Sequence, residues 1–278
     1  TAESTRDEML IAKALNRLAI TVERDAPERA AQIYRRALGI FESAGDARGQ
    51  ARCHNNLGNI AVTQNAWQEA RQSYATAISL ARSAGMPDLW GTAAMNLGVS
   101  SHRNGDFERA REFFGEALAI VAAVKNSELQ LYALYNMAHL ELENRAWDSG
   151  AELYEATSSL AHRIGADDVE IGAIAGEGLC RARAGRLDLA RQAYAEVTGR
   201  VQRRADWFQG RELVIALSME VMIADGRFEE AADYLETAFP VVEAADLYTA
   251  AWLASQCSAG LMKQAPTRIR PWVERYSA

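Results

Sequence analysis

The sequence predicts an all-α fold, an α-solenoid built from antiparallel helix pairs, on the basis of two observations. The first is an internal repeat, because residues of the same kind return every 40 positions along the chain. The second is the spacing inside each repeat, where small and aromatic residues lie three or four positions apart and therefore on one face of a helix. The repeated positions are Asn16, Asn56, Asn96 and Asn136, followed later in each repeat by Tyr34, Tyr74, Phe114, Tyr154 and Tyr194.

Each repeat divides into two helices joined by a short polar turn. In the second repeat, the turn at residues 65–67 precedes Ala70, Tyr74 and Ala77, whose spacing places them on one face of the second helix. A brief connection favours an antiparallel arrangement of the two helices. Gly58 in the first helix then faces Ala70, and small side chains at both positions allow the backbones to approach closely. Each pair leaves an apolar face that the next pair covers, so such units come in arrays.

The residues Leu57-Gly58, followed by Ala70, Tyr74 and Ala77, resemble the signature of the tetratricopeptide repeat. That repeat usually has about 34 residues, whereas the period here is 40. We expect the additional residues to lengthen the helices. The long repeats of kinesin light chains, of bacterial peptide-pheromone receptors and of sensor regions in multidomain regulators are similar.

The resemblance extends over about residues 10–245 and is clearest in the second to fourth repeats. It is looser in the fifth, where Glu177 stands in the usual leucine position, and in the sixth. We therefore predict six tetratricopeptide-like repeats in residues 1–245. Residues 246–278 are expected to form a capping helix, which begins with an apolar stretch at residues 247–253, and a tail.

Composition excludes several classes of protein. The chain has 278 residues, a net charge of −7 and a pI near 5.3, which disfavours a nucleic-acid partner and an anionic membrane surface. No apolar run is long enough to span a bilayer, and no signal peptide is expected. Cys53, Cys180 and Cys257 lie far apart, so we expect buried thiols and a reducing cytoplasm rather than disulfides or zinc. The absent initiator methionine is compatible with a segment of a longer protein.

The sequence contains no motif typical of catalysis. The four histidines have no metal-binding spacing, and there is no nucleophile elbow, phosphate-binding loop or dinucleotide-binding glycine pattern. We therefore predict that the protein is not an enzyme and has no cofactor and no metal site.

The resemblance implies a right-handed α-solenoid in which the first helix of each repeat lines the inner, concave surface. Asparagine carries both a donor and an acceptor, so one asparagine per repeat could hold the backbone of an extended peptide while its neighbours read side chains. The predicted binding residues are Arg52, Asn55, Asn56, Asn59, Asn96, Arg103, Tyr132, Tyr135, Asn136 and His139. An alternative for Asn56, Asn96 and Asn136 is a structural role, in which each amide bonds to the adjacent repeat.

Two functions fit these observations. The first is a non-catalytic scaffold that binds a protein or peptide segment on the concave surface. The alternative is a ligand-sensing region of a larger signalling or transcription-regulating protein. A homodimer through the terminal helices is a further possibility, because uncapped arrays expose apolar ends.

An arginine-rich stretch at residues 181–204 is either an anion site or a solvated face.

Overall fold

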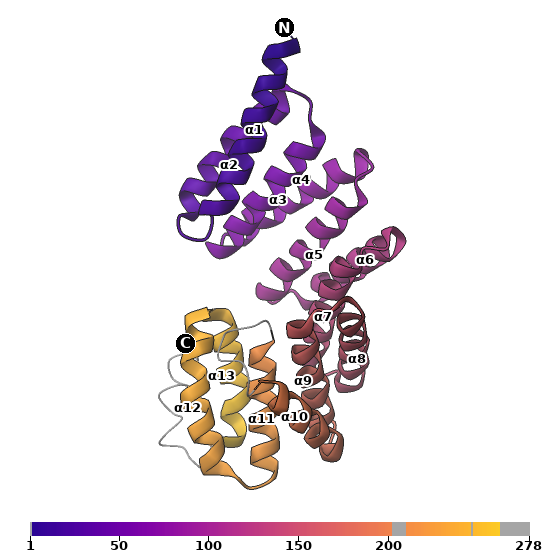
Figure 1. Ribbon diagram of the computed structural model, residues 1–278, viewed down its shortest axis with the longest axis vertical. Coiled ribbons are helices and arrows are strands. Elements are labelled where there is room, and N and C mark those ends of the chain that lie inside the picture. The colour runs from indigo at the N-terminus through magenta and orange to yellow at the C-terminus, as the bar shows by residue number, and fades with distance from the viewer. Residues whose placement is uncertain (1, 202–209, 246, 262–278) are drawn as a thin grey trace. The chain divides into compact units, whose positions relative to one another are not determined.

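The computed structural model describes the backbone of residues 2–201, 210–245 and 247–261, and these ranges contain thirteen α-helices and no strand (Figure 1). The helices are α1 (Ala2–Val22), α2 (Pro27–Ser43), α3 (Ala47–Thr63), α4 (Trp67–Ser83), α5 (Pro87–Arg103), α6 (Phe107–Val124), α7 (Ser127–Glu143), α8 (Trp147–Ile164), α9 (Asp167–Arg183), α10 (Leu187–Val201), α11 (Arg211–Ala224), α12 (Phe228–Ala245) and α13 (Leu247–Leu261).

The period of 40 residues consists of two halves of equal length. From α2 to α10, each helix begins 20 residues after the one before it. Most of these helices have 17 residues, which corresponds to a length of about 26 Å. The residues in excess of the usual tetratricopeptide unit therefore lie in the helices, because the connections have only three or so residues.

The chain leaves each helix from α2 to α9 through a residue in the left-handed conformation. Glycine serves at most of these positions, for example Gly45, Gly85 and Gly105, with φ between 63° and 79°. The following backbone N–H returns to a carbonyl five residues earlier, as from Asp46 to Phe41 at 2.9 Å. This is a Schellman closure, and glycine suits it because a Cβ is strained at positive φ.

Three of these exits carry a side chain instead, at Asn65, Lys125 and Arg145. We expect Lys125→Gly to raise the free energy of unfolding by about 0.5–1 kcal/mol, because it removes the left-handed penalty at φ 56°. Urea denaturation of the variant and the wild type measures this. Lys125→Ala is the control, since alanine keeps the strain. An equal gain from alanine would contradict the explanation.

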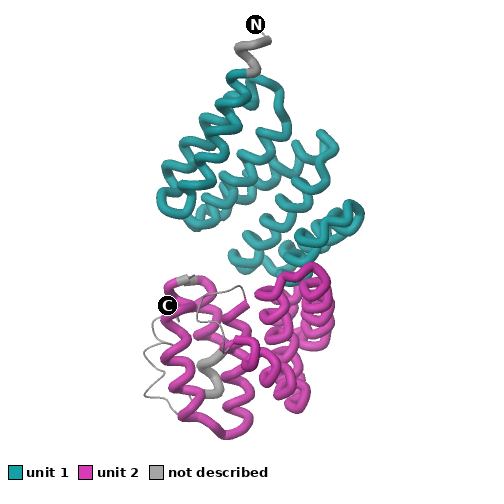
Figure 2. Tube along the Cα trace, in the orientation of Figure 1, with its two compact units in different colours: residues 1–136 teal, residues 137–278 magenta. Residues whose placement is uncertain are grey.

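The chain forms two compact units, residues 1–136 and residues 137–278 (Figure 2). In unit 1, each helix from α1 to α6 packs against the next one along the chain. In unit 2, α8 packs on α9, α9 contacts both α10 and α11, and α13 packs against α11 and α12. The predicted all-α arrangement of antiparallel helix pairs is confirmed within each unit. The expected boundary at residues 245 and 246 lies between α12 and α13, and the expected tail lies outside the described residues.

Buried aromatic rings fill the core between the helices of a pair. The rings of Tyr74 and Phe114 are buried and lie directly over glycines of the preceding helix. A Cβ added to Gly58 would lie 2.6 Å from Tyr74, and one added to Gly98 would lie 2.6 Å from Phe114. The small residue of the signature thus makes room for the aromatic ring of the next helix.

Candidate functional site

The predicted binding residues lie on three successive first helices. Arg52 and the asparagines 55, 56 and 59 are on α3, Asn96 and Arg103 are on α5, and the remaining four are on α7. Nine of the ten belong to unit 1, and only His139 belongs to unit 2. In unit 2, the His139 ring lies against Trp252, with centroids 4.9 Å apart, and its Nδ1 is 3.4 Å from Glu143.

The asparagines of α3 and α5 form one hydrogen-bonded network. Asn96 donates from Nδ2 to Oδ1 of Asn55 at 2.9 Å and to Oδ1 of Asn59 at 3.3 Å. Asn55, which is only 7% exposed, donates to Asn56 at 3.3 Å. The hydroxyl of Tyr74 donates to Asn59 at 2.8 Å. The network therefore joins α3, α4 and α5, and it satisfies polar groups that would be costly to bury alone.

The tyrosine hydroxyls that contact α3 act as donors. Burial raises the pKa of Tyr74 well above its ordinary value. Burial, together with a hydrogen bond of 2.8 Å to Glu23, likewise raises the pKa of Tyr34. Both hydroxyls stay protonated at neutral pH, so they hold their partners by donation.

Asn136 behaves differently, although it occupies the same position in the repeat. Its Nδ2 donates to the carbonyl of Tyr132, one turn earlier in α7, at 2.8 Å. Of the two tyrosines on α7, Tyr132 is 37% exposed and Tyr135 is 4% exposed. The exposed members of the predicted set are therefore Arg52 and Tyr132. The partly exposed members are Asn56, Asn59, Asn96, Arg103, Asn136 and His139.

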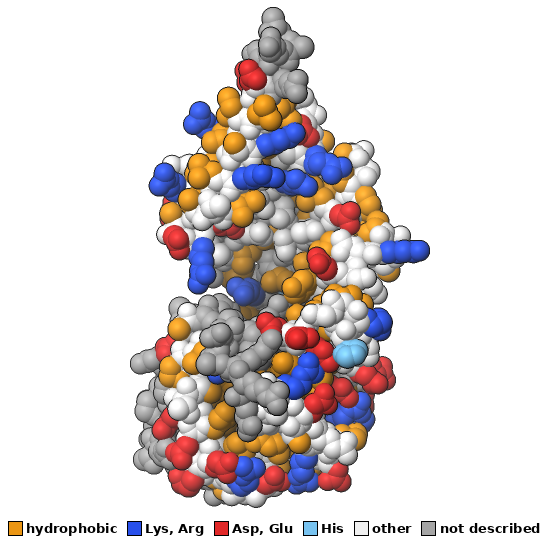
Figure 3. All heavy atoms as spheres, viewed as in Figure 1, with side chains coloured by type: hydrophobic (Ala, Val, Ile, Leu, Met, Phe, Trp, Pro, Cys, Tyr) orange, Lys and Arg blue, Asp and Glu red, His pale blue; other side chains and the backbone are white. Residues whose placement is uncertain are grey.

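A pocket that the sequence did not reveal lies between α1 and α3 in unit 1. This α1–α3 pocket has a volume of about 590 Å³ and includes Arg52 among its lining residues. The side chains that the argument below uses are Leu10, Lys13, Arg17, Ile20, Arg48 and Arg52, and all six are exposed. In Figure 3, Lys and Arg side chains (blue) and hydrophobic side chains (orange) lie together over the first helices of the chain.

The sequence of α1 contains one signal for this pocket, a side of the helix that carries both basic and apolar residues. Leu10, Lys13, Ala14, Arg17 and Ile20 follow a spacing of three or four and share one side of the helix, away from the buried Ala12 and Ala19. Apolar residues on the solvent side of an N-terminal helix are a signal that the repeat pattern does not require.

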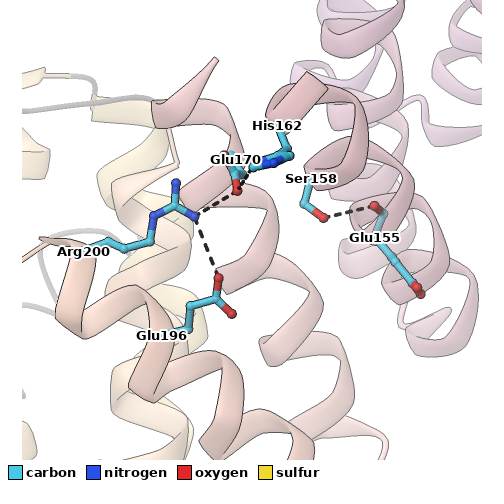
Figure 4. A network of polar contacts seen from close by, with 6 residues as sticks. All are labelled: Glu155, Ser158, His162, Glu170, Glu196 and Arg200. Carbon is cyan, nitrogen blue, oxygen red and sulfur yellow. Dashed lines mark hydrogen bonds and ion pairs between the residues drawn. The ribbon is translucent and has the colours of Figure 1, made fainter. Parts of the chain in front are cut away.

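Unit 2 contains a pocket of about 530 Å³ formed by α8, α9 and α10, and its polar groups bond to one another (Figure 4). Glu170 lies 3.0 Å from Arg200 and 3.4 Å from Nδ1 of His162. The hydrogen bond from Arg200 is the main reason that the pKa of Glu170 is lowered. Arg200 also lies 3.8 Å from Glu196. These charges are compensated inside the protein.

The described arginines of the arginine-rich stretch at residues 181–204 are also compensated by carboxylates. Each of its arginines from 181 to 200 has an ion pair with a carboxylate. The pairs are Arg181 with Glu177, Arg183 with Glu220, Arg186 with Asp148, Arg191 with Asp225 and Arg200 with Glu170. Arg203 and Arg204 lie outside the described residues. These pairs favour a solvated face over an anion site in this stretch.

A second pocket in unit 2, of about 510 Å³, is lined by residues of α7, α9, α11 and α13. Arg183 lies within it, 5.6 Å from the centre of the Trp147 ring, and donates to Gln256 at 2.6 Å. We name it the α7–α13 pocket.

The two described cysteine side chains are buried thiols. Burial raises the pKa of Cys53 and of Cys180 to about 12, so both are protonated at neutral pH. The thiol of Cys53 lies 3.7 Å from Oδ1 of Asn16, which links α3 to α1. The side chain of Cys257 lies outside the described residues.

Known proteins share this fold at low sequence identity. No protein-family model and no curated protein matches the sequence. Aspartyl phosphate phosphatase F from Bacillus subtilis superimposes with a TM-score of 0.75 at 9% identity, over 99% of this chain and 72% of that one. NprR, in complex with its cognate peptide NprX, has a TM-score of 0.64 at 14% identity, over 98% of this chain and 77% of that one.

A third similar structure is of a protein that contains a tetratricopeptide repeat sensor. A signal transduction ATPase with numerous domains and a tetratricopeptide repeat sensor, from Pyrococcus horikoshii, has a TM-score of 0.67 at 15% identity, over 97% of this chain and 38% of that one. The fold thus defines this chain as an α-solenoid of tetratricopeptide-like helix pairs. None of its described helices is both long and apolar enough to cross a membrane.

Proposed function

We propose that the protein is a non-catalytic cytoplasmic scaffold whose first helices bind an extended protein or peptide segment. The main support for the proposal is the charge of the α1–α3 pocket. Its exposed arginines have no carboxylate partner among the described residues. The described arginines of residues 181–200, by contrast, are all paired with carboxylates. Unpaired charge on a surface is available to a ligand at no cost of breaking an existing ion pair.

The asparagine network supports the same function. Within the described residues, the network uses only Oδ1 of Asn59 and only Nδ2 of Asn96. Nδ2 of Asn59 and Oδ1 of Asn96 are left as a donor and an acceptor on neighbouring helices, and both side chains are partly exposed. A peptide backbone offers the complementary pair at each residue. The structural role and the binding role of these amides are thus compatible.

The other predicted residues have either a direct or an indirect role in the proposed binding. Arg52, Tyr132 and Asn136 are exposed enough to contact a ligand directly. Asn55, Asn56 and Tyr135 act through the position of their helices. The charge of Arg103 on α5 offsets part of the rise that burial causes in the pKa of Tyr74. His139 belongs to unit 2 and lies against Trp252 there. NprR, which was solved in complex with its cognate peptide NprX, is a precedent for the fold.

The alternative is a region that senses a small ligand for a larger regulatory protein. The α7–α13 pocket favours it, because a volume of about 510 Å³ is in the range of small-molecule sites. The ATPase with a tetratricopeptide repeat sensor is a precedent of the same fold, of which this chain matches 38%.

The test is a selection of peptides from a displayed random library on the immobilised protein. We expect enriched peptides to bind an Arg52→Ala/Tyr132→Ala variant about tenfold or more weakly than the wild type, because both side chains lie on first helices. The matched control is Arg36→Ala on the second helix α2, where the side chain is also exposed. An equal loss in the control, or no enrichment of any peptide, would contradict the proposal.

A further inference from the structure

We propose that the α1–α3 pocket binds an acidic peptide segment in which two apolar side chains flank a run of carboxylates. This inference rests on the proposed function and names the class of segment that this part of the surface prefers. Charge complementarity between the pocket and such a segment is the main argument for it.

The positive charge of the pocket is uncompensated. Lys13 and Arg17 on α1 and Arg48 and Arg52 on α3 line it, and no carboxylate of the described residues lies within 4.0 Å of these four cations. Asp46 is the one acidic residue in the lining. Its Oδ1 accepts from the backbone N–H groups of Arg48 and Gly49 at 3.1 and 3.2 Å, so it caps α3.

The sequence of α3 explains why Arg48 and Arg52 have no partner in their own helix. Two arginines of unit 2 pair with a carboxylate three or four residues away in their own helix, Arg181 with Glu177 and Arg191 with Asp188. The helix Ala47–Thr63 contains no Asp or Glu at all. Unit 1 as a whole is neutral, with 15 Lys and Arg against 15 Asp and Glu, so the excess of positive charge is local to this pocket.

The apolar side chains define the spacing of the expected ligand. Leu10 is 59% exposed and Ile20 is 55% exposed, and both line the pocket. Their positions on α1 are separated by about 15 Å along the helix axis. An extended segment advances about 3.3 Å per residue, so two apolar residues about four or five positions apart would reach both. The carboxylates between them would then lie over Lys13 and Arg17.

The apolar pair also favours a peptide over other anions. A nucleic acid or a phosphate would use the cations but leave Leu10 and Ile20 uncovered. A peptide with acidic and apolar residues uses both kinds of contact. The net charge of −7 on the whole chain opposes non-specific attraction of polyanions.

The experiment uses synthetic fluorescent peptides in which two leucines flank a short run of glutamates. The first comparison peptide has glutamine for glutamate, and the second has alanine for leucine. Fluorescence anisotropy with the full chain measures their affinities. We expect the acidic peptide to bind at least about tenfold more tightly than either comparison peptide, with an affinity that falls as salt is added.

A charge exchange locates the site. We expect Arg17→Glu/Arg52→Glu to weaken binding of the acidic peptide about tenfold or more, and to strengthen binding of a matched peptide with lysine for glutamate. The control, Arg36→Glu/Arg71→Glu, reverses two exposed arginines on the second helices α2 and α4. Circular dichroism and urea denaturation confirm that both variants are folded. Equal effects of the two variants would overturn the assignment.

The remaining outcomes separate this inference from the proposed function. If library-selected peptides bind but the acidic peptide binds no better than its glutamine version, the inference fails and the scaffold stands. If neither kind of peptide binds, both fail. Equal competition by single-stranded DNA or anionic vesicles would indicate general anion binding and overturn the peptide assignment. Self-association in sedimentation that is lost in Arg17→Glu/Arg52→Glu would assign the pocket to a second copy instead.

Discussion

Gly98→Ala is expected to lower the free energy of unfolding by about 2 kcal/mol, because the added methyl group would overlap the ring of Phe114. The Cβ would lie 2.6 Å from both Cδ1 and Cε1 of that ring. The ring is fully buried, so it can yield only by displacing α5 from α6. The loss should exceed the gain in helix propensity that alanine brings at an unhindered site.

Gly39→Ala is the matched control for this prediction. Gly39 also lies within a helix, α2, but a Cβ there would have no atom within 4 Å. We expect this change to raise the free energy of unfolding by about 0.5–1 kcal/mol. Urea denaturation followed by circular dichroism compares both variants with the wild type. In a double-mutant cycle, Phe114→Leu should reduce the cost of Gly98→Ala. Equal stability of the two alanine variants would refute close packing as the role of Gly98.

Asn96→Ala is expected to lower the free energy of unfolding by about 2 kcal/mol, because it removes the group that donates a hydrogen bond to Oδ1 of the buried Asn55. Asn96 gives hydrogen bonds of 2.9 Å to Asn55 and 3.3 Å to Asn59. Tyr74 still donates to Asn59 in the variant, so the penalty falls mainly on Asn55.

Asn136→Ala provides the control, since within the described residues of unit 1 the amide of Asn136 bonds only to the carbonyl of Tyr132 in its own helix. We expect a change of less than about 0.5 kcal/mol for this variant. Thermal and urea denaturation measure both. If Asn136→Ala destabilised the protein as much as Asn96→Ala, the repeat position itself would matter rather than the network.

This difference bears on how binding should be tested. A variant that removes Asn96 changes the contact between α3 and α5, so a loss of binding in it could reflect altered helix positions. Arg52 and Tyr132 are exposed, and their removal breaks no hydrogen bond of the network. Binding experiments that substitute these two residues therefore distinguish contact from structure.

The sequence alone was sufficient for the fold. The period of 40 residues, the turns at residues such as 65–67 and the small and aromatic pairs gave the helix pairs and their order. This was possible because helix formation and helix ends depend on residues a few positions apart, which a repeat displays several times. The spacing predicted that Gly58 faces Ala70, whereas in the structure the ring of Tyr74 lies against Gly58.

The tertiary structure decided what the polar residues do. Asn96 and Asn136 occupy the same position in the repeat, yet Asn96 reaches α3 and Asn136 bonds within α7. Arg183 on α9 pairs with Glu220 of α11, whereas Arg48 and Arg52 on α3 have no carboxylate partner among the described residues. Apolar side chains are sorted by helix periodicity, but an amide or a guanidinium takes whichever partner lies within about 3 Å of it. The partners of Asn96 and Arg183 come from other helices, so their identity appears only when the helices are packed.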